Sequence, residues 1–242
     1  TLKHWDLGAG TRALLALPTS FVAGQAMVVR GVVGAWDLEL IEPSSTPSWS
    51  SAKDFVALTP HQAQGWVNQG AGTTAKLLLG GGPVSKTLLG ALLDSGRVAE
   101  VWESYGLSEA LTHVATRKLA AITDLQSPFH PLPSVTIGTN EAGCAVIHAP
   151  SRAVTLETRD CIEELPEGGF LWLGRADDVI NSGGVLVHPG EVERAFETFM
   201  PAWVSDWAAF GRADDTLGEA VVLRLAGTVP EDVDAEQILD EW

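Results

Sequence analysis

The feature that most constrains the fold of this chain is the alternation of short apolar runs with helical segments. The run at residues 13–17 holds only Ala and Leu and ends at Pro18. A continuous apolar run bounded by a breaker is typical of a strand that is covered on both faces. Further strands are expected at 38–41, 55–58, 76–79 and 98–102, and helices at 24–33, 62–67 and 85–94. This order predicts an α/β lobe built on a parallel sheet.

After residue 135 the pattern changes to short strands expected at 135–138, 144–148 and 170–174, separated by turn residues. They predict a small β subdomain that ends a large domain over residues 1–174. A loop, a helix at 189–199, a strand at 220–225 and a Glu-rich helix beginning near Asp234 follow. These elements predict the start of a small, incomplete α+β C-terminal domain over residues 175–242.

Composition narrows the class of protein and of partner. An apolar fraction of 45% with 19% charged residues fits a globular chain that buries a core. The formal charge of −16 opposes the attraction of nucleic-acid phosphates and anionic lipids, so no nucleic acid is expected as a partner. The longest uncharged apolar stretch, residues 13–29, is interrupted by Pro18, Thr19, Ser20 and Gln25, so membrane insertion is not expected.

The cysteines and the first residues of the chain give an expectation for the cellular compartment of the protein. Cys144 and Cys161 have no metal-ligand spacing and form no disulfide framework, so we expect free thiols in a reducing, cytoplasmic environment. No secretion signal opens the chain. Thr1 in place of Met suggests a partial or processed sequence. The sequence leaves the oligomeric state open, a homo-oligomer included.

Three segments carry residues suited to ligand chemistry. In the first, the strand at 76–79 runs into Gly80, Gly81, Gly82 and Pro83. Glycine permits positive φ and a close approach of the backbone, so a nucleobase can lie against this turn. The same glycines also suit a tight strand-to-helix turn that binds nothing.

The second segment runs from Trp102 to Glu109 and is predicted to form a loop after a strand. Tyr105 offers a ring face to adenine, the Ser108 hydroxyl can hold a phosphate oxygen, and the Glu109 carboxylate can hold Mg²⁺ beside phosphate. An ordinary amphipathic turn is the alternative interpretation.

The third segment covers residues 174–184 and contains Arg175, Asp177 and a Gly183-Gly184 pair, before a helix opened by Pro189. A charged linker would explain the acidic residues but not the complete ordered string.

Together and in this order, the segments resemble the adenylate-forming superfamily of acyl-CoA synthetases, adenylation domains and luciferases. Residues 105–109 match its Tyr-Gly-x-Thr-Glu loop, with Ser for Thr. Residues 158–160 match its Thr-Gly-Asp element, with Arg159 for Gly, and residues 174–184 match Gly-Arg-x-Asp-Asp-x-Ile-Lys-x-x-Gly, with Asn181 for Lys. Residues 17–24, 59–62 and 180–184 look most like o-succinylbenzoate–CoA ligases.

The resemblance implies roles for individual residues. It implies that ATP or AMP contacts Gly81, Gly82, Pro83, Tyr105, Gly106 and Ser108, with Asp160 and Arg175 on the ribose hydroxyls. Glu109 would bind Mg²⁺ and act with Ser108 in catalysis. Asp177 would be the hinge between the two half-reactions.

The acyl substrate would be bound by Phe21, Gln25 and the segment from Leu107 to His113. A carboxylate of that substrate would face His113, Arg30 or Arg117, although a lone His is more often structural. Gly183 and Gly184 would move towards the coenzyme A channel.

The resemblance therefore implies a ligase that activates a small aromatic carboxylate with ATP and transfers it to coenzyme A, as in menaquinone biosynthesis. A ligase for another aryl or fatty acid and a non-catalytic nucleotide-binding module stay open as alternatives. The superfamily's triphosphate loop would precede Thr1 and its catalytic lysine would follow Trp242, so the chain alone is expected to lack full activity.

Overall fold

The computed structural model describes residues 2–69, 71–196, 199–201 and 203–228. The chain forms two compact units, each described here by itself. The first comprises Thr1–Thr158 and Ile162–Trp172, and the second comprises Arg159–Cys161 and Leu173–Trp242. The functional boundary expected at residue 175 stays a prediction.

A seven-stranded sheet forms the centre of the first unit. Its strands are β1 (Arg12–Leu15), β2 (Asp37–Leu40), β3 (Lys53–Leu58), β4 (Thr74–Leu79), β5 (Val98–Leu107), β6 (Thr112–Leu119) and β7 (His130–Pro131). The order is β2-β1-β3-β4-β5-β6-β7. Strands β1 to β5 run parallel, whereas β6 and β7 are antiparallel additions that were not predicted.

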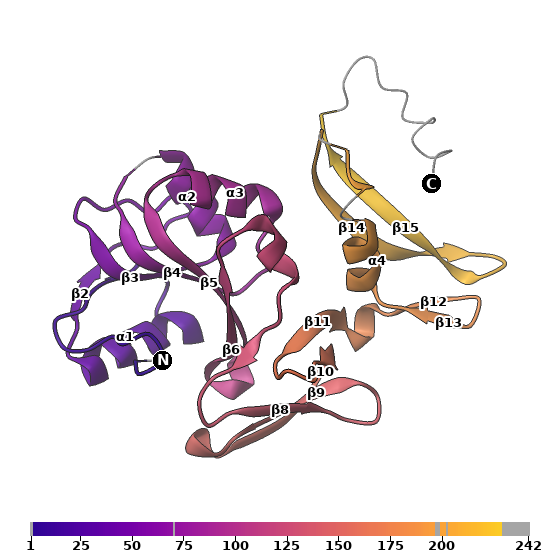
Figure 1. Ribbon diagram of the computed structural model, residues 1–242, viewed down its shortest axis with the longest axis horizontal. Coiled ribbons are helices and arrows are strands. Elements are labelled where there is room, and N and C mark those ends of the chain that lie inside the picture. The colour runs from indigo at the N-terminus through magenta and orange to yellow at the C-terminus, as the bar shows by residue number, and fades with distance from the viewer. Residues whose placement is uncertain (1, 70, 197–198, 202, 229–242) are drawn as a thin grey trace. The chain divides into compact units, whose positions relative to one another are not determined.

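Helices cover both faces of this sheet, as the apolar runs predicted. Helix α1 (Val22–Gly34) lies on one face, and α2 (Pro60–Gln69) and α3 (Lys86–Asp94) lie on the other (Figure 1). Because side chains alternate along a strand, Leu14 packs with Trp66 in the α2/α3 layer, while Leu15 packs with Met27 in the α1 layer. All five side chains of the run at 13–17 are buried.

Strand β5 is longer than predicted. It continues to Leu107 through the segment expected to be a loop, because β6 pairs with it antiparallel as far as Thr112. The register shifts between Tyr105 and Gly106, which is the position of a β-bulge.

A second, four-stranded sheet contains β8 (Thr136–Thr139), β9 (Cys144–Ala149), β10 (Val154–Glu164) and β11 (Phe170–Arg175), in the order β11-β10-β9-β8. Three of these strands were predicted and β10 was not. Cys144 and Cys161 are buried free thiols, as expected.

The second unit contains a four-stranded sheet of order β13-β12-β15-β14, built from β12 (Ile180–Ser182), β13 (Val185–Val187), β14 (Val204–Asp214) and β15 (Gly218–Gly227). The loop predicted after Gly174 was wrong, because β12 and β13 pair as a hairpin there. Helix α4 (Pro189–Phe196) packs on β14, where Trp207 Nε1 donates to the Glu193 carbonyl at 3.3 Å. The helix expected near Asp234 and residues 197–198 of the predicted 189–199 helix lie outside the described residues.

No helix in the described part of the chain is long and apolar enough to cross a membrane.

Candidate active site

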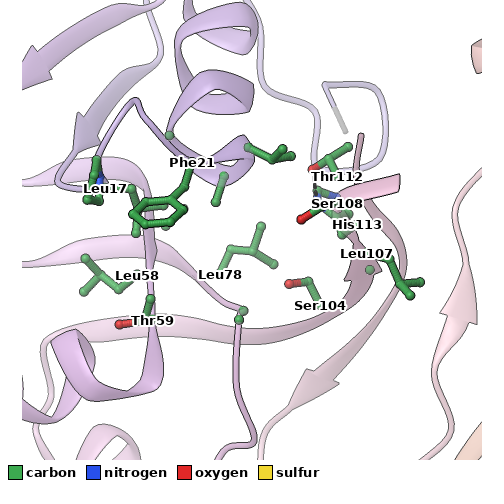
Figure 2. Close-up of a pocket in the computed structure, with 18 of the residues that line it drawn as sticks. Leu17, Phe21, Leu58, Thr59, Leu78, Ser104, Leu107, Ser108, Thr112 and His113 are labelled. Atoms are coloured by element: carbon green, nitrogen blue, oxygen red, sulfur yellow. Dashed lines mark hydrogen bonds between the residues drawn. The ribbon is translucent and has the colours of Figure 1, made fainter. Parts of the chain in front are cut away.

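A cavity of about 330 Å³ opens at the carboxyl ends of the parallel strands in the first unit. Its walls come from the segments that follow β1, β3 and β4, from the last part of β5, and from the start of β6. The lining residues include Leu17, Phe21, Leu58, Thr59, Leu78, Gly80, Gly81, Ser104, Gly106, Leu107, Ser108, Thr112 and His113. In Figure 2, Leu17 and Phe21 lie on one side of the cavity, and Ser108, Thr112 and His113 lie on the other.

The topology of the sheet explains this position. From β1 the chain passes to β2 on one side, and then to β3 and β4 on the other. Open α/β sheets bind ligands outside the carboxyl ends of their strands, at the point where the strand order reverses. The cavity lies at that edge of the sheet, where the sequence predicted a site.

A polar cluster forms part of the otherwise mainly apolar wall. Arg30, which is 8% exposed, donates from Nη2 to Thr112 Oγ1 at 3.0 Å. The same Nη2 lies 3.2 Å from Nδ1 of His113, which is 6% exposed. Because a guanidinium only donates hydrogen bonds, Nδ1 of His113 is the acceptor in this contact. A buried cation beside an imidazole suits an anionic group on a bound molecule.

The segment Thr59 to Gln62 is held by the buried side chain of Gln62. Its Nε2 donates to the Ala16 carbonyl at 2.9 Å and to the Ser44 carbonyl at 3.0 Å, while its Oε1 accepts from the Thr59 N–H at 3.2 Å. Gln62 thereby ties the Thr59 wall to the end of β1. This part of the family pattern therefore has a positioning role in the fold.

The glycine turn after β4 makes close approaches. A Cβ on Gly80 would lie 2.4 Å from Ser104 Oγ, which donates to the Leu79 carbonyl at 2.9 Å. Gly81 has φ +81°, in the left-handed region that favours glycine. Both residues line the cavity.

Not all of the predicted site residues line the cavity. Gln25, Gly82, Pro83 and Glu109 are exposed positions outside its lining. Tyr105 is 9% exposed and packs edge-on against Phe170, with ring centroids 5.2 Å apart. In this arrangement Tyr105 belongs to a hydrophobic core cluster that also contains Val114, Phe129 and Ile147. Its role at adenine stays a prediction.

In the second unit, the predicted ribose and hinge residues form one chain of ion pairs. Arg175 lies 3.8 Å from Asp160 and donates to Asp177 at 3.1 Å. Arg159 Nη1 donates to the other Asp177 oxygen at 2.6 Å. The hydrogen bond from Arg175, and then that from Arg159, holds the pKa of Asp177 below its ordinary value. Arg159, which departs from the family's glycine, was not predicted to contact the hinge.

Gly183 and Gly184 form the two-residue turn of the β12–β13 hairpin. Their φ angles are +62° and +88°, which a tight hairpin turn of this kind requires at both positions. The Gly183 N–H donates to the Leu217 carbonyl at 2.8 Å, and the Gly184 N–H donates to Asn181 Oδ1 at 3.1 Å. Asn181, which stands where the family has Lys, thus closes the turn.

Thr59, Leu78, Gly80 and Ser104 line the cavity but were not assigned to the acyl pocket. Thr59, Leu78 and Gly80 stand at or just beyond the carboxyl end of a strand, and that position is the signal that identifies them. Ser104 lies inside β5, where no local pattern marks it. Arg117, one of three candidates to face a substrate carboxylate, is instead paired with Glu103 at 2.6 Å and does not line the cavity.

Comparisons with known proteins agree with the resemblance that the sequence motifs show. No protein-family profile matches the chain. A protein of Mycobacterium tuberculosis named as a probable 2-succinylbenzoate–CoA ligase is 31% identical over 90% of this chain and 62% of its own length. The 2-succinylbenzoate–CoA ligase of Geobacillus kaustophilus is 28% identical over 74% of this chain and 44% of its own length. The chain therefore spans less than two thirds of these relatives.

Solved structures give a similar result. The o-succinylbenzoate coenzyme A synthetase of Bacillus subtilis, in complex with its acyl-adenylate intermediate, superposes with a TM-score of 0.73 at 20% identity, covering 98% of this chain and 55% of that one. This likeness concerns the fold. An AMP-forming acyl-CoA synthetase/AMP-acid ligase II-like protein of Dyadobacter fermentans superposes with a TM-score of 0.63 at 32% identity, covering 99% of this chain and 70% of that one. By its sequence and its fold, the chain belongs to the AMP-forming acyl-CoA synthetase family.

Proposed function

We propose that this chain is the distal part of an ATP-dependent carboxylate–CoA ligase, acting on o-succinylbenzoate in menaquinone biosynthesis. The whole protein would form an acyl-adenylate and pyrophosphate, and would then transfer the acyl group to coenzyme A. The observation that carries the proposal is the mainly apolar cavity at the strand ends, with the buried Arg30 and His113 in its wall.

The cavity suits an aromatic acid that bears a second carboxylate. Leu17, Phe21, Leu58 and Leu78 supply apolar surface for a ring. Arg30 supplies a cation whose burial removes competition from water, which strengthens its attraction for an anion. A simple aryl or fatty acid would leave this polar cluster without an anionic partner in the substrate.

The residues proposed to contact the nucleotide are Tyr105, Ser108, Glu109, Asp160 and Arg175. Glu109 is an exposed carboxylate. Mg²⁺ is commonly bound by one or two carboxylates with substrate phosphates and water as its other ligands, which is the role proposed for Glu109.

Activation of the acid would depend on positioning and charge. Electrostatic stabilisation of the transferring groups is expected to dominate catalysis in such a site. Ser108 and Glu109 would hold the phosphate and its metal ion, while Asp177 would be the hinge that lets coenzyme A reach the adenylate beside Gly183 and Gly184. A cytoplasmic location fits the two free buried thiols. Assembly into a homo-oligomer stays a prediction.

Substrate profiling tests the acyl assignment. In the full-length protein, pyrophosphate release with o-succinylbenzoate should exceed that with benzoate or a fatty acid. Arg30→Met should raise KM for the dicarboxylic acid far more than for benzoate, because only the dicarboxylic acid has a second carboxylate for the guanidinium. A preference of the full-length protein for a fatty acid would show that the acyl substrate proposed here is wrong. If the full-length protein releases no pyrophosphate with any acid, the non-catalytic module is favoured instead.

Calorimetric titration with AMP tests the nucleotide assignment. Asp160→Ala should weaken AMP binding by roughly 1.5–3 kcal/mol, the usual contribution of a hydrogen bond to a charged group. Asp214→Ala is a matched control, because Asp214 caps a turn through the Thr216 and Leu217 N–H groups at the far end of β14. Equal AMP affinity in the Asp160→Ala variant and the parent chain would remove Asp160 from the ribose site.

A further inference from the structure

Glu103 and Arg117 form a buried ion pair that neither the acyl pocket nor the proposed nucleotide contacts include. Arg117 donates to Glu103 Oε2 from Nε at 2.8 Å and from Nη2 at 2.6 Å. The side chains of Glu103 and Arg117 are 7% and 13% exposed. A buried ion pair is often no more stabilising than an apolar pair of the same volume, so stability alone does not explain it.

The other contacts of Arg117 hold residues that pack near the ring of Tyr105. Its Nη1 donates to the carbonyls of Leu125 and Ser127 at 2.6 and 3.0 Å, and so fixes the segment that precedes Phe129. The guanidinium also lies over the Phe129 ring, 4.4 Å from its centroid. The Phe129 and Tyr105 ring centroids are 6.0 Å apart. Arg117 therefore fixes one side of the Tyr105 environment.

Glu103 lies beside the other segment proposed to contact adenine. Glu103 is the register partner of Leu79 in the parallel β4–β5 pair, directly before the turn Gly80 to Pro83. Glu103 is also two residues from Tyr105 on the same strand, so both side chains project from one face of β5. The ion pair thus lies beside the strand end from which the glycine turn starts, and it contacts Phe129, which packs against the Tyr105 ring.

We propose that Glu103 and Arg117 are positioning residues that set the spacing between the glycine turn and the Tyr105 ring, and hence the slot for a flat purine base. This inference rests on the proposed nucleotide function. Arg117 suits the task because its planar fork binds one carboxylate through two nitrogens while a third nitrogen binds two carbonyls. Lysine has no such fixed geometry.

The test measures AMP binding to the complete chain by calorimetry. Arg117→Met should weaken AMP affinity about tenfold, within the range that loss of aromatic stacking on a base gives. Arg117→Lys should recover only part of this loss. Arg97→Met is the matched control: Arg97 Nη1 also donates to two carbonyls, of Trp66 and Val67, but at the amino end of β5. It should lower thermal stability and leave AMP affinity unchanged.

A second ligand separates positioning from general loss of structure. Ribose 5-phosphate, used as a competitor of AMP, carries the sugar and phosphate without the base. Its affinity should be the same in the Arg117→Met variant and the parent chain, because the base slot alone is disturbed. An equal loss for both ligands would overturn the positioning role.

The remaining outcomes are also decisive. If the parent chain binds no AMP, the proposed nucleotide function fails and the positioning role fails with it. If the parent binds AMP and Arg117→Met binds it equally well, only the positioning role is wrong. Should Arg117→Met not fold, Glu103→Leu combined with Arg117→Met leaves no unpaired buried charge, and its AMP and ribose 5-phosphate affinities decide in the same way.

Discussion

At the scale of single residues, Gly80, which directly follows β4, has no room for a side chain. A methyl group there would lie 2.4 Å from Ser104 Oγ and would displace the hydroxyl from the Leu79 carbonyl. Gly80→Ala should therefore lower the free energy of unfolding by about 1 kcal/mol or more in urea titrations. In a Ser104→Ala background the clash is gone, because Ser104 Cβ is 3.8 Å away. An equal cost of Gly80→Ala in both backgrounds would show that Ser104 is not the cause.

Glu103 makes the stability of the chain depend on pH in a direction opposite to most carboxylates. Burial raises the pKa of Glu103, although Arg117 opposes the rise. Between the pKa of the unfolded chain and that of the folded chain, Glu103 is protonated in the folded state only. Stability therefore falls as pH rises from about 4.5 through the folded pKa, by up to about 1.4 kcal/mol per pH unit. Replacing Glu103 with Gln should remove this decline, as measured by the difference in unfolding free energy between parent and variant across pH.

The substitution Asp177→Asn should reveal a contribution to stability with the opposite pH dependence. The pKa of Asp177 is held low by Arg175 and Arg159, so its contribution is present above the ordinary pKa of an aspartate and is lost as pH falls. Its exposure to solvent makes this effect small. A parent-minus-variant difference for Glu103 that rises with pH, as the difference for Asp177 should, would contradict the interpretation of Glu103.

At the scale of elements, helix α3 begins at a cap that its sequence specifies. Ser85 Oγ accepts the Leu88 N–H at 3.2 Å, and the helix then buries Leu88, Leu89 and Leu92 against the sheet. Ser85→Ala should cost about 1 kcal/mol, or about 2–4 °C in the melting temperature of a chain of this size. Ser85→Asp keeps an acceptor and should melt close to the parent. Equal losses in the two variants would mean that the hydroxyl does not act as a cap.

The elements also show which parts of the fold are readable from the sequence. The strand at 13–17 was predicted because a continuous apolar run that ends at a breaker is typical of a strand covered on both faces. The strand at 76–79 and the helix at 24–33 were predicted as well. The end of β5 was mistaken for a loop because Gly106 indicates a turn, whereas pairing with β6 keeps it extended. Strand β10 was missed because its first residues alternate only between half-buried and exposed and include charged side chains, which tertiary pairing holds in a strand.

At the scale of the whole molecule, the proposed hinge gives the sharpest test of mechanism. Proline at position 177 would fix φ near −65° and hold one arrangement of the catalytic cycle. In the full-length protein, Asp177→Pro should leave acyl-adenylate formation largely intact and sharply reduce thioester formation. Asp177→Ala removes the contacts to Arg159 and Arg175 without restricting φ, and should spare both half-reactions. Separate assays of pyrophosphate release and of coenzyme A consumption give the answer, and equal losses in both would indicate a folding defect.

The candidate site was only partly readable from the sequence. Phe21, Leu107 and His113 were expected at the acyl pocket and do line the cavity, because motif and strand order together indicate which edge of the sheet they reach. The contact of Arg30 with Thr112 and His113 joins residues more than eighty positions apart, which no local pattern reveals. The contact between Arg159 and Asp177 depends likewise on the course of β10.

The order of the strands has a consequence for how the chain reaches its native state. β1 lies between β2 and β3, and the link from Arg12 to Asp54 spans 42 residues. Two parallel strands cannot pair until the segment that connects them has folded across the sheet. Such sheets therefore fold slowly, and their apolar strands stay exposed to solvent until they pair. The cavity, which needs β1, β3, β4 and β5 side by side, is therefore among the last features to form. Refolding yield should fall steeply with protein concentration, because the all-apolar run at 13–17 can associate with other chains before it pairs within its own sheet.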